Sequence, residues 1–157
     1  MIETSLQQSL EIWQHNQQLF VKLLDRFDND QLNRIPAGFN NNIVWNIGHC
    51  LATRMLLTYA IAKQPIPLDG YWIDNFRKGT KPTEDVSATK VEELKNLFTE
   101  SLLQLKKDLD ENDFFKQYSS YTTSTNFTID SIEKAVAFAG FHDGIHIGSV
   151  LALAKLI

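Results

Sequence analysis

Apolar side chains recur every three or four residues in four separate segments of the chain, and polar side chains fill the positions between them. This spacing places the apolar residues along one face of an amphipathic helix. The pattern predicts a first helix from Glu3 to about Phe27 and a second from about Ile43 to Ala62. A third helix is predicted from about Lys90 to Leu109, and a last one starts near Thr128 or Asp130 and runs to the end of the chain.

Residues with strong local preferences mark the ends of these helices. Asn40 to Asn42 offer side-chain oxygens that cap the second helix, and Pro65 and Pro67 end it because proline donates no backbone N–H. Glu133 lies where a capping box places an acidic side chain at the start of the last helix. The first helix is expected to stop in the segment DNDQLNRIPAG, which is rich in Asp, Asn, Pro and Gly.

Two of the connections between the predicted helices are long. The segment LDGYWIDNFRKGTKPTEDVSAT, residues 68–89, is expected to be irregular, although its aromatic residues argue against disorder. A second polar loop, NDFFKQYSSYTTSTN, precedes the last helix. No segment has a convincing strand pattern, and there is no internal repeat or heptad run. The sequence therefore predicts an all-α protein, a single domain over residues 1–157 that forms a four-helix bundle with long crossing connections.

Composition narrows the class of protein without changing this architecture. Of the 157 residues, 43% are hydrophobic and 22% are charged, as expected of a globular domain. The net charge of −4 provides no basic surface for nucleic acid, and no stretch approaches about 18 uninterrupted apolar residues, so we expect no membrane span. The N-terminus lacks the features of a signal peptide. The single cysteine, Cys50, excludes a disulfide framework, and we expect a cytoplasmic protein.

Two of the four histidines lie four residues apart in the segment FHDGIHIG, close to the C-terminus. On a helical wheel at about 100° per residue, His142 and His146 share one arc with the residues that should face the core. That arc comprises Ile132, Ala135, Ala139, His142, His146, Ser149, Val150 and Leu153. The spacing stacks both imidazoles one turn apart on the inner face, as in the metal-binding helix of the HExxH motif.

The second helix carries a third inward histidine. His49 shares one face of this helix with Trp45, Thr53, Leu56 and Ala60. Facing helices of a bundle supply metal ligands in this way. Three neutral imidazoles form an open zinc site, in which the fourth position is left for water or substrate.

A simpler explanation is a set of buried histidines, each held by a hydrogen bond. With four histidines in the chain, the chance that some pair is four residues apart is roughly 0.08, so the spacing alone is weak evidence. Three inward histidines are harder to explain in this way, because each buried ring has two nitrogens that need partners. We therefore favour a metal site at His49, His142 and His146, and we expect His15 on the surface.

Three further features of these helices have two interpretations. Gly140, Gly144 and Gly148 lie nearly opposite the histidines, and each costs about 1 kcal/mol relative to Ala in a helix. We expect a neighbouring helix or a partner subunit to pack closely there, the alternative being that the glycines are merely tolerated. Asp143 is able to orient a ligating imidazole, but its angle of about 100° from the nearest histidine favours a surface or capping role. Cys50 is expected to be a small packing residue and not a ligand.

The segment NIVWNIGHCLATRMLL resembles the W-x-x-G-H-L segment on the second helix of the DinB-like (DinB/YfiT) superfamily, and FHDGIHIGSV resembles the H-x-x-x-H-x-G segment on its last helix. The resemblance implies a four-helix bundle and a divalent metal held by His49, His142 and His146. Many relatives are dimers, which implies a homodimer. Two positions depart from the family pattern. Cys50 replaces the usual Leu, and Ser149 stands where the family often has Gln, which puts any role of that Gln toward the substrate in doubt.

Characterised relatives include thiol transferases that use low-molecular-weight thiols such as bacillithiol, and a mycothiol-dependent isomerase; many others are described as metal-dependent hydrolases.

Three neutral imidazoles leave the metal its full charge, so it lowers the pKa of bound water to about 7 or holds a thiol as thiolate. The ligand set suits Zn or Ni first, and also Fe or Cu. We expect a divalent-metal-dependent S-transferase or hydrolase that acts on a small molecule through a metal-bound water or thiolate, with a low-molecular-weight thiol as candidate cosubstrate. No general base stands out, which favours the thiol. The alternative is a non-catalytic, metal-stabilised binding or stress-response module.

Five residues are candidates for lining the substrate site: Trp45, Tyr71, Trp72, Arg77 and Ser149. Those in the long connection are chosen because binding residues concentrate on loops held by a rigid scaffold. The alternative for these loop residues is that they cover the end of the bundle.

Overall fold

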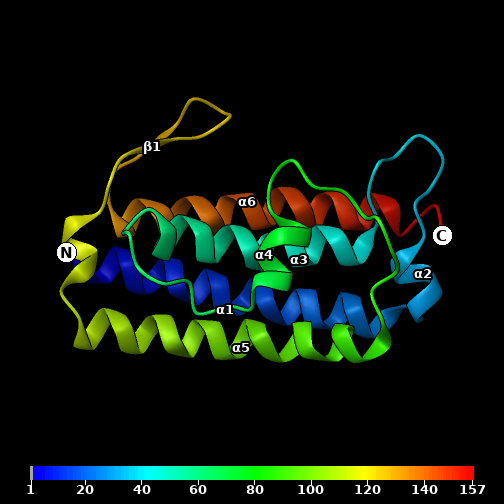
Figure 1. Cartoon of the computed structure of the whole chain (residues 1–157), viewed down its shortest axis with the longest axis horizontal. Coiled ribbons are helices and arrows are strands. Elements are labelled where there is room, and N and C mark those ends of the chain that lie inside the picture. Colours follow the sequence, from blue (N-terminus) through cyan, green and yellow to red (C-terminus); the bar gives the residue numbers. More distant parts are fainter. Residues whose placement is uncertain (1) are drawn as a thin grey trace.

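Four long helices run side by side along the length of the molecule (Figure 1). The structure is a computed structural model that describes residues 2–157, without the side chains of residues 2–4 and 114. The long helices are α1 (Ile2–Arg26), α3 (Ile43–Met55), α5 (Ala88–Glu111) and α6 (Ile132–Leu153). They agree with the four helices predicted from the apolar periodicity, and the all-α fold is confirmed.

Short elements occupy the connections and the helix ends. They are α2 (Asn29–Asn33), the π-helical turn η1 (Leu56–Ala60), α4 (Gly70–Phe76), the 3₁₀ turn η2 (Phe114–Gln117), and the strands β1 (Tyr121–Thr122) and β2 (Thr128–Ile129). The two strands pair antiparallel, and their hairpin projects away from the four long helices (Figure 1). The sequence showed no convincing strand pattern, and this short hairpin is the exception.

The connection over residues 68–89 is not wholly irregular, because it contains α4. Asp69 precedes this helix, and its carboxylate accepts a hydrogen bond from the backbone N–H of Tyr71 at 2.8 Å. Trp72 and Phe76 are buried, so the aromatic residues of the connection fix α4 against the bundle. A cap and a few aromatic side chains suffice to order a helix too short to show an apolar repeat.

The last helix starts at Ile132, later than the predicted start at residues 128–130, because the chain first forms strand β2. Its cap is Ser131, whose hydroxyl accepts a hydrogen bond from the backbone N–H of Lys134 at 3.3 Å. The position that completes a capping box is therefore occupied by Lys134 and not by Glu133. The predicted capping box is wrong.

The second long helix begins where the asparagine run predicts. Asn42 caps α3, and its side chain accepts a hydrogen bond from the backbone N–H of Trp45 at 2.8 Å. The α-helical turns end at Met55, and the following turn η1 is π-helical. Single π-helical turns are rare and often lie at functional sites.

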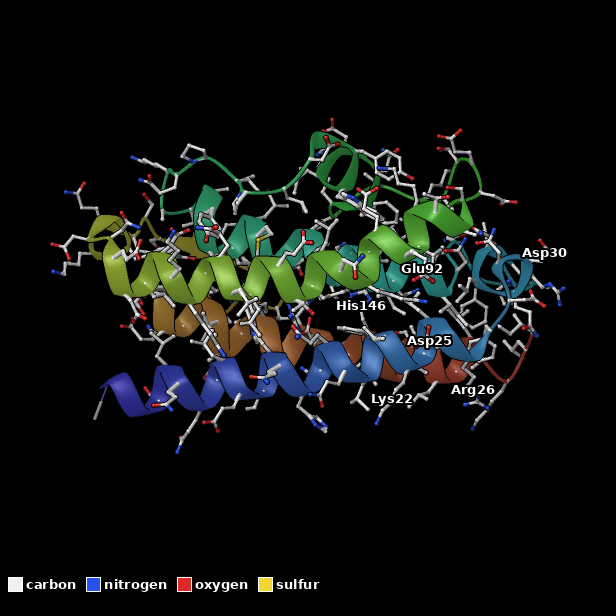
Figure 2. The ribbon with its side chains drawn as sticks, turned by 90° about the horizontal axis from the view of Figure 1, so that it is seen from below. Lys22, Asp25, Arg26, Asp30, Glu92 and His146 are labelled. Carbon is white, nitrogen blue, oxygen red and sulfur yellow. The ribbon has the colours of Figure 1, made fainter. Side chains whose placement is uncertain are left out.

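The core lies where α6 packs against both α1 and α3. Its largest fully buried side chains include Trp13, Phe20, Leu94 and Phe98, and each such side chain contributes about 1.5–3 kcal/mol to folding. Charged residues of α1 point away from this core: Figure 2 shows Lys22 on the outer side of that helix.

Within the described chain, α6 is long and apolar enough to cross a membrane by length and composition. A core helix can have the same composition, and α6 carries His142, Asp143 and His146 on the side that packs against α1 and α3. Its opposite side carries large exposed apolar residues, with Phe141 56% and Leu151 47% exposed. The outward side of the helix is therefore apolar and is not covered by the described chain.

The glycine row of α6 contacts a neighbouring helix at only one position. A Cβ atom at Gly140 would lie 3.4 Å from the Cγ2 atom of Ile12 in α1. Cβ atoms at Gly144 and Gly148 would meet no described atom within 4 Å. The prediction that a helix of the same chain packs closely on Gly144 and Gly148 is therefore wrong. The prediction that a partner subunit packs there stays a prediction.

Candidate metal centre

Three imidazole rings from two helices converge beside the core. The ring centroids of His49, His142 and His146 lie 4.5–5.0 Å apart. The Nε2 atoms of His49 and His142 are 3.2 Å apart, and one ring nitrogen from each of the three residues lies within 4.8 Å of the others. The structure thus brings together the three histidines singled out from the sequence. His15 is exposed.

Backbone geometry orients the ring of His49. Its Nδ1 atom lies 2.7 Å from the carbonyl oxygen of Phe76, which can only accept a hydrogen bond. Nδ1 therefore carries the proton, and the Nε2 atom with its lone pair lies 3.2 Å from the Nε2 atom of His142 and 3.4 Å from the hydroxyl of Thr53. The indole of Trp45 stacks on the same ring, with centroids 4.8 Å apart and planes 9° apart. Both contacts hold the imidazole in one orientation.

Gly48 makes this approach of Phe76 possible. A Cβ atom at position 48 would lie 2.5 Å from the Cδ1 atom of the Phe76 ring, which is closer than atoms tolerate. Glycine at this position lets the end of α4 lie directly on α3. The carbonyl oxygen that holds His49 depends on that contact. The W-x-x-G-H segment therefore has a physical explanation: it supplies the stacking ring, the space for Phe76 and the histidine that both contacts orient.

An asparagine side chain orients the ring of His146. The Asn46 amide nitrogen donates hydrogen bonds to the Asn41 side chain at 3.0 Å and to the Asn42 carbonyl oxygen at 2.8 Å. Its Oδ1 atom is therefore the acceptor for the Nδ1 atom of His146, at 2.8 Å. This leaves the Nε2 lone pair of His146 free. Asn46 was missed in the sequence, although it lies three residues before His49 and so on the same side of α3.

The third ring, that of His142, lacks such a partner. Its Nδ1 atom is buried and has no hydrogen-bond partner among the described residues. The neutral ring has two tautomers. If Nε2 of His142 carries the proton, the buried Nδ1 atom is an acceptor without a partner. If Nδ1 carries the proton, the lone pair on Nε2 of His142 faces the lone pair on Nε2 of His49. A cation shared by the Nε2 atoms removes the repulsion in the second case.

Next to His142 in the sequence, Asp143 belongs to a buried charged cluster in which side chains of α1, α3 and α6 meet. The carboxylate of Asp143 accepts hydrogen bonds from Arg54 at 2.6 and 3.1 Å and from Asn16 at 3.3 Å. Arg54 is 1% and Asp143 0% exposed. The predicted surface or capping role of Asp143 is therefore wrong. The residue lies on a second buried side of α6, which α1 and α3 cover together.

Burial sets the protonation of the three imidazoles near neutral pH. Desolvation lowers the pKa of His49, against the effect of its hydrogen bond to Phe76. Desolvation and then the neighbouring charges lower the pKa of His142 to about 3, and desolvation with His49 lowers that of His146 to about 4. The rings are neutral at pH 7, which is the form that binds metals.

Cys50 and Asp143 form a second set of potential ligands with His142, again within 4.8 Å. Burial raises the pKa of the Cys50 thiol, and the charge of Asp143 raises it further, so the thiol stays protonated. Burial also raises the pKa of Asp143, while Arg54 opposes the rise. The Arg54 guanidinium beside this carboxylate repels a cation. The three histidines are therefore the better-suited set, and Cys50 lies in the buried core, where a small packing residue is expected.

The three-histidine set fits a divalent metal. Two nitrogen ligands in a tetrahedral zinc site, each at about 2.0–2.1 Å from the ion, lie about 3.4 Å apart, close to the 3.2 Å between the Nε2 atoms of His49 and His142. No fourth Cys, Asp, Glu or His of the described chain joins this cluster. The protein thus provides three neutral nitrogen donors, and the remaining side is open.

The open side faces a cavity of about 530 Å³. Its walls come from the end of α3 and η1, from α6 and from the β1–β2 hairpin. The lining residues are His49, Thr53, Leu56, Leu57, Ala60, Ile61, Lys78, Tyr121, Thr123, Ser124, Thr125, Phe138, Phe141, His142, Ile145 and His146. A volume of about 300–1,000 Å³ is typical of small-molecule sites.

The structure places two of the five predicted substrate-lining residues in a different hollow. Trp45 and Tyr71 line a small pocket together with residues 81–84, and His49 is not among its described lining residues. Trp45 therefore contributes to the histidine cluster by stacking on the His49 ring. The pocket that it lines is the small one, and not the cavity beside the histidines.

The other three predicted lining residues also lie outside the cavity wall. Trp72 is fully buried and donates a hydrogen bond to Glu93 at 2.8 Å. Arg77 is exposed at the end of α4. Ser149 is half-buried, and its hydroxyl donates to the carbonyl oxygen of Ile145 at 3.1 Å. Besides α3, α6 and Lys78, the cavity is lined by η1 and the hairpin, which are elements without a distinct sequence pattern.

Comparison with known proteins agrees with this architecture. The sequence profile of the DinB superfamily matches residues 12–150. A solved structure of a conserved protein from Enterococcus faecalis is similar to this chain with a TM-score of 0.63 and 20% identity, over 96% of this chain and 95% of that one. At this identity the likeness concerns the fold. None of the curated proteins with which the sequence was compared matches it.

Proposed function

Because the chain belongs to the DinB superfamily, we propose that it is a metal-dependent enzyme that acts on a small molecule, with His49, His142 and His146 as the metal ligands. The observation that carries the proposal is the orientation of the rings. Hydrogen bonds at Nδ1 leave the Nε2 lone pairs of His49 and His146 free, the Nε2 atom of His49 lies 3.2 Å from that of His142, and ring nitrogens of all three residues lie within 4.8 Å of one another. Such contacts fix metal-ligating imidazoles in their binding tautomer.

The metal, with Zn or Ni as first choice and Fe or Cu next, supplies Lewis acidity that activates a thiol or water. Residues of the chain do the rest. The three histidines face the cavity, so a substrate bound there lies beside the ligand set. Hydrogen bonds from the two Nδ1 atoms to the Phe76 carbonyl and the Asn46 side chain keep these rings in place while a substrate binds.

Transfer of a thiol is favoured over hydrolysis. Hydrolysis gains from a positioned general base, most often His, Asp or Glu. Apart from the three ligands, the described wall of the cavity contains no histidine or carboxylate. We therefore place an S-transferase using a low-molecular-weight thiol first and a hydrolase second.

The alternative function is a metal-stabilised binding module without turnover. A purely structural metal site is closed by four protein ligands. Only three histidines contribute here in the described chain, and the cavity lies on their open side. This arrangement favours the enzyme.

Elemental analysis of the purified protein tests the proposal, with His49→Ala as the disrupted variant and His15→Ala as the matched surface control. We expect stoichiometric metal in the wild type and the control, and loss in the His49 variant. The metal-loaded protein is then assayed with thiols plus simple electrophiles and with model esters. Absence of metal refutes the proposal, and metal without turnover in either assay favours the binding module.

We also propose a homodimer that forms through the outward side of α6. Apart from Lys134 in its first turn, the exposed residues of this side are uncharged: Ala137, Phe141, Gly144, Ile145, Gly148, Leu151 and Ala152. Exposed apolar patches mark interaction sites, and a neutral helix face with small residues is complementary to a second copy of itself in a two-fold dimer. The buried free thiol of Cys50 fits the reducing cytoplasm that we propose as location.

Light scattering after size exclusion tests the dimer. The wild type should elute at twice the chain mass of 18.0 kDa, and Leu151→Glu should shift it to the monomer. Leu103→Glu is the control, because Leu103 is 61% exposed on α5. A monomeric wild type, or a dimer that survives Leu151→Glu, contradicts the proposal.

A further inference from the structure

The cavity beside the three histidines has walls of unequal chemistry. The aliphatic side chains Leu56, Leu57 and Ile61 of the η1 region line one side, and Phe138, Phe141 and Ile145 of α6 line the other. These six side chains offer no hydrogen bond. A polar or multiply charged ligand would therefore lose hydration against them without compensation.

Apart from the three histidines and Thr53 of α3, the polar groups of the wall come from the hairpin and from one loop residue. Tyr121, Thr123, Ser124 and Thr125 contribute hydroxyl groups, and Lys78 contributes an ammonium group. Lys78 is the one charged side chain in the described wall, and no described carboxylate forms an ion pair with it. The cavity thus has an unpaired positive charge, with no negative group to attract a cation.

The hairpin wall is attached to the bundle. The hydroxyl of Tyr118 donates a hydrogen bond to the carbonyl oxygen of Leu57, within the π-helical turn. The backbone N–H of Ser119 donates to the carbonyl oxygen of Ile61 at 3.3 Å. Both bonds hold the chain at the base of the hairpin against η1. The cavity is therefore formed before a ligand binds, which lowers the entropic cost of binding.

From these observations we infer that the cavity binds a largely apolar small molecule with a single anionic group, which pairs with Lys78. The inference rests on the proposed function, because it assigns the substrate class of the same site. In a thiol transfer the occupant of the cavity is the electrophile, since a thiol with several charged groups would place them against the six apolar side chains. Such a thiol binds toward the solvent side of the ligand set.

Binding to the metal-free, full-length protein tests the inference independently of catalysis. Calorimetry would compare three eight-carbon probes: octanoate, octylammonium and 1-octanol. Octanoate should bind at least about fivefold more tightly than octylammonium, because the one charge of the wall is positive. Hexanoate should bind about 15-fold more weakly than octanoate, since each methylene removed from an apolar site costs about fourfold in affinity.

Two variants with matched controls locate the binding. Lys78→Met should weaken octanoate about fivefold and leave 1-octanol unchanged, whereas Lys22→Met on the outer side of α1 should change neither (Figure 2). Ala60→Trp should weaken all three probes by occupying part of the cavity, whereas Ala88→Trp, at an exposed alanine on α5, should not. Equal affinity for octanoate and octylammonium, or affinities unchanged in Ala60→Trp, overturns the inference.

Metal analysis of the same samples separates the two proposals. A protein that shows the expected probe preference but never binds metal refutes the proposed function alone. A protein that binds metal and turns over a substrate, yet shows no preference for the apolar anion, refutes the present inference alone.

Discussion

Removal of one partner of the Arg54–Asp143 pair should strongly destabilise the fold. Both side chains are almost fully buried, at 1% and 0% exposure. Besides Asp143, the guanidinium contacts the carbonyl oxygen of Trp13 at 3.2 Å, and its centre lies 4.6 Å from the Trp13 ring and 5.2 Å from that of Phe98. Asp143→Ala leaves this positive charge in the core without its counter-ion.

The magnitude follows from the burial of both groups. Breaking a buried ion pair on one side costs about 3–5 kcal/mol in the free energy of unfolding, because an uncompensated charge stays in the core. For a domain of this size that corresponds to a fall in Tm of about 10 °C. Replacing both partners by apolar residues, as in Arg54→Met with Asp143→Leu, should recover most of the loss.

Urea denaturation of the metal-free protein, followed by circular dichroism, measures these differences. The control is Glu111→Ala, which removes an exposed ion pair to Lys107 of 3.9 Å on α5 and should leave the midpoint unchanged. A loss below about 1 kcal/mol for Asp143→Ala would show that the cluster does not carry a buried charge pair. A double variant less stable than either single variant would refute the explanation by an unpaired charge.

Three further predictions concern the ligand set. Gly48→Ala should destabilise the fold by about 1–3 kcal/mol, because the new Cβ atom would overlap the Phe76 ring, as urea denaturation would show; an unchanged midpoint contradicts the contact. Asn46→Leu should weaken zinc binding about 10–100-fold in a chelator competition, because the His146 ring loses its orienting acceptor; unchanged affinity contradicts that role. The Tm of the metal-free protein should fall as the pH drops from about 6.5 to about 4, since over this range the unfolded chain takes up protons that the folded His142 and His146 do not; a flat profile would exclude such a pKa difference.

The long helices and the histidine faces could be predicted because both depend on periodicity alone. A 3.6-residue repeat determines which residues share a side of a helix, so the sequence alone assigns His142 and His146 to the inner side of the last helix. The same repeat misplaced Asp143, because it assumes one buried arc per helix. α6 packs against two helices, and its buried arc is wide enough to include a residue about 100° away from a ligand.

The residues around the ligands were harder to predict because they depend on contacts distant in sequence. The acceptor for His49 is a backbone carbonyl 27 residues away, and no side-chain pattern encodes it. Arg54 and Asp143 are 89 residues apart, and each alone resembles a surface charge. The cavity wall depends on the π-helical turn and on the hairpin, both too short to show a repeat.

The contact between Phe76 and His49 has a consequence for redesign of the site. The group that holds His49 belongs to the main chain, so replacing the side chain at position 76 cannot delete it. A point substitution reaches this carbonyl only indirectly, through the packing of the Phe76 ring on Gly48. His146 is held by the side chain of Asn46, so a single codon change replaces its acceptor directly. A library aimed at metal selectivity would therefore vary the packing between α3 and α4 near His49 and the acceptor side chain itself near His146.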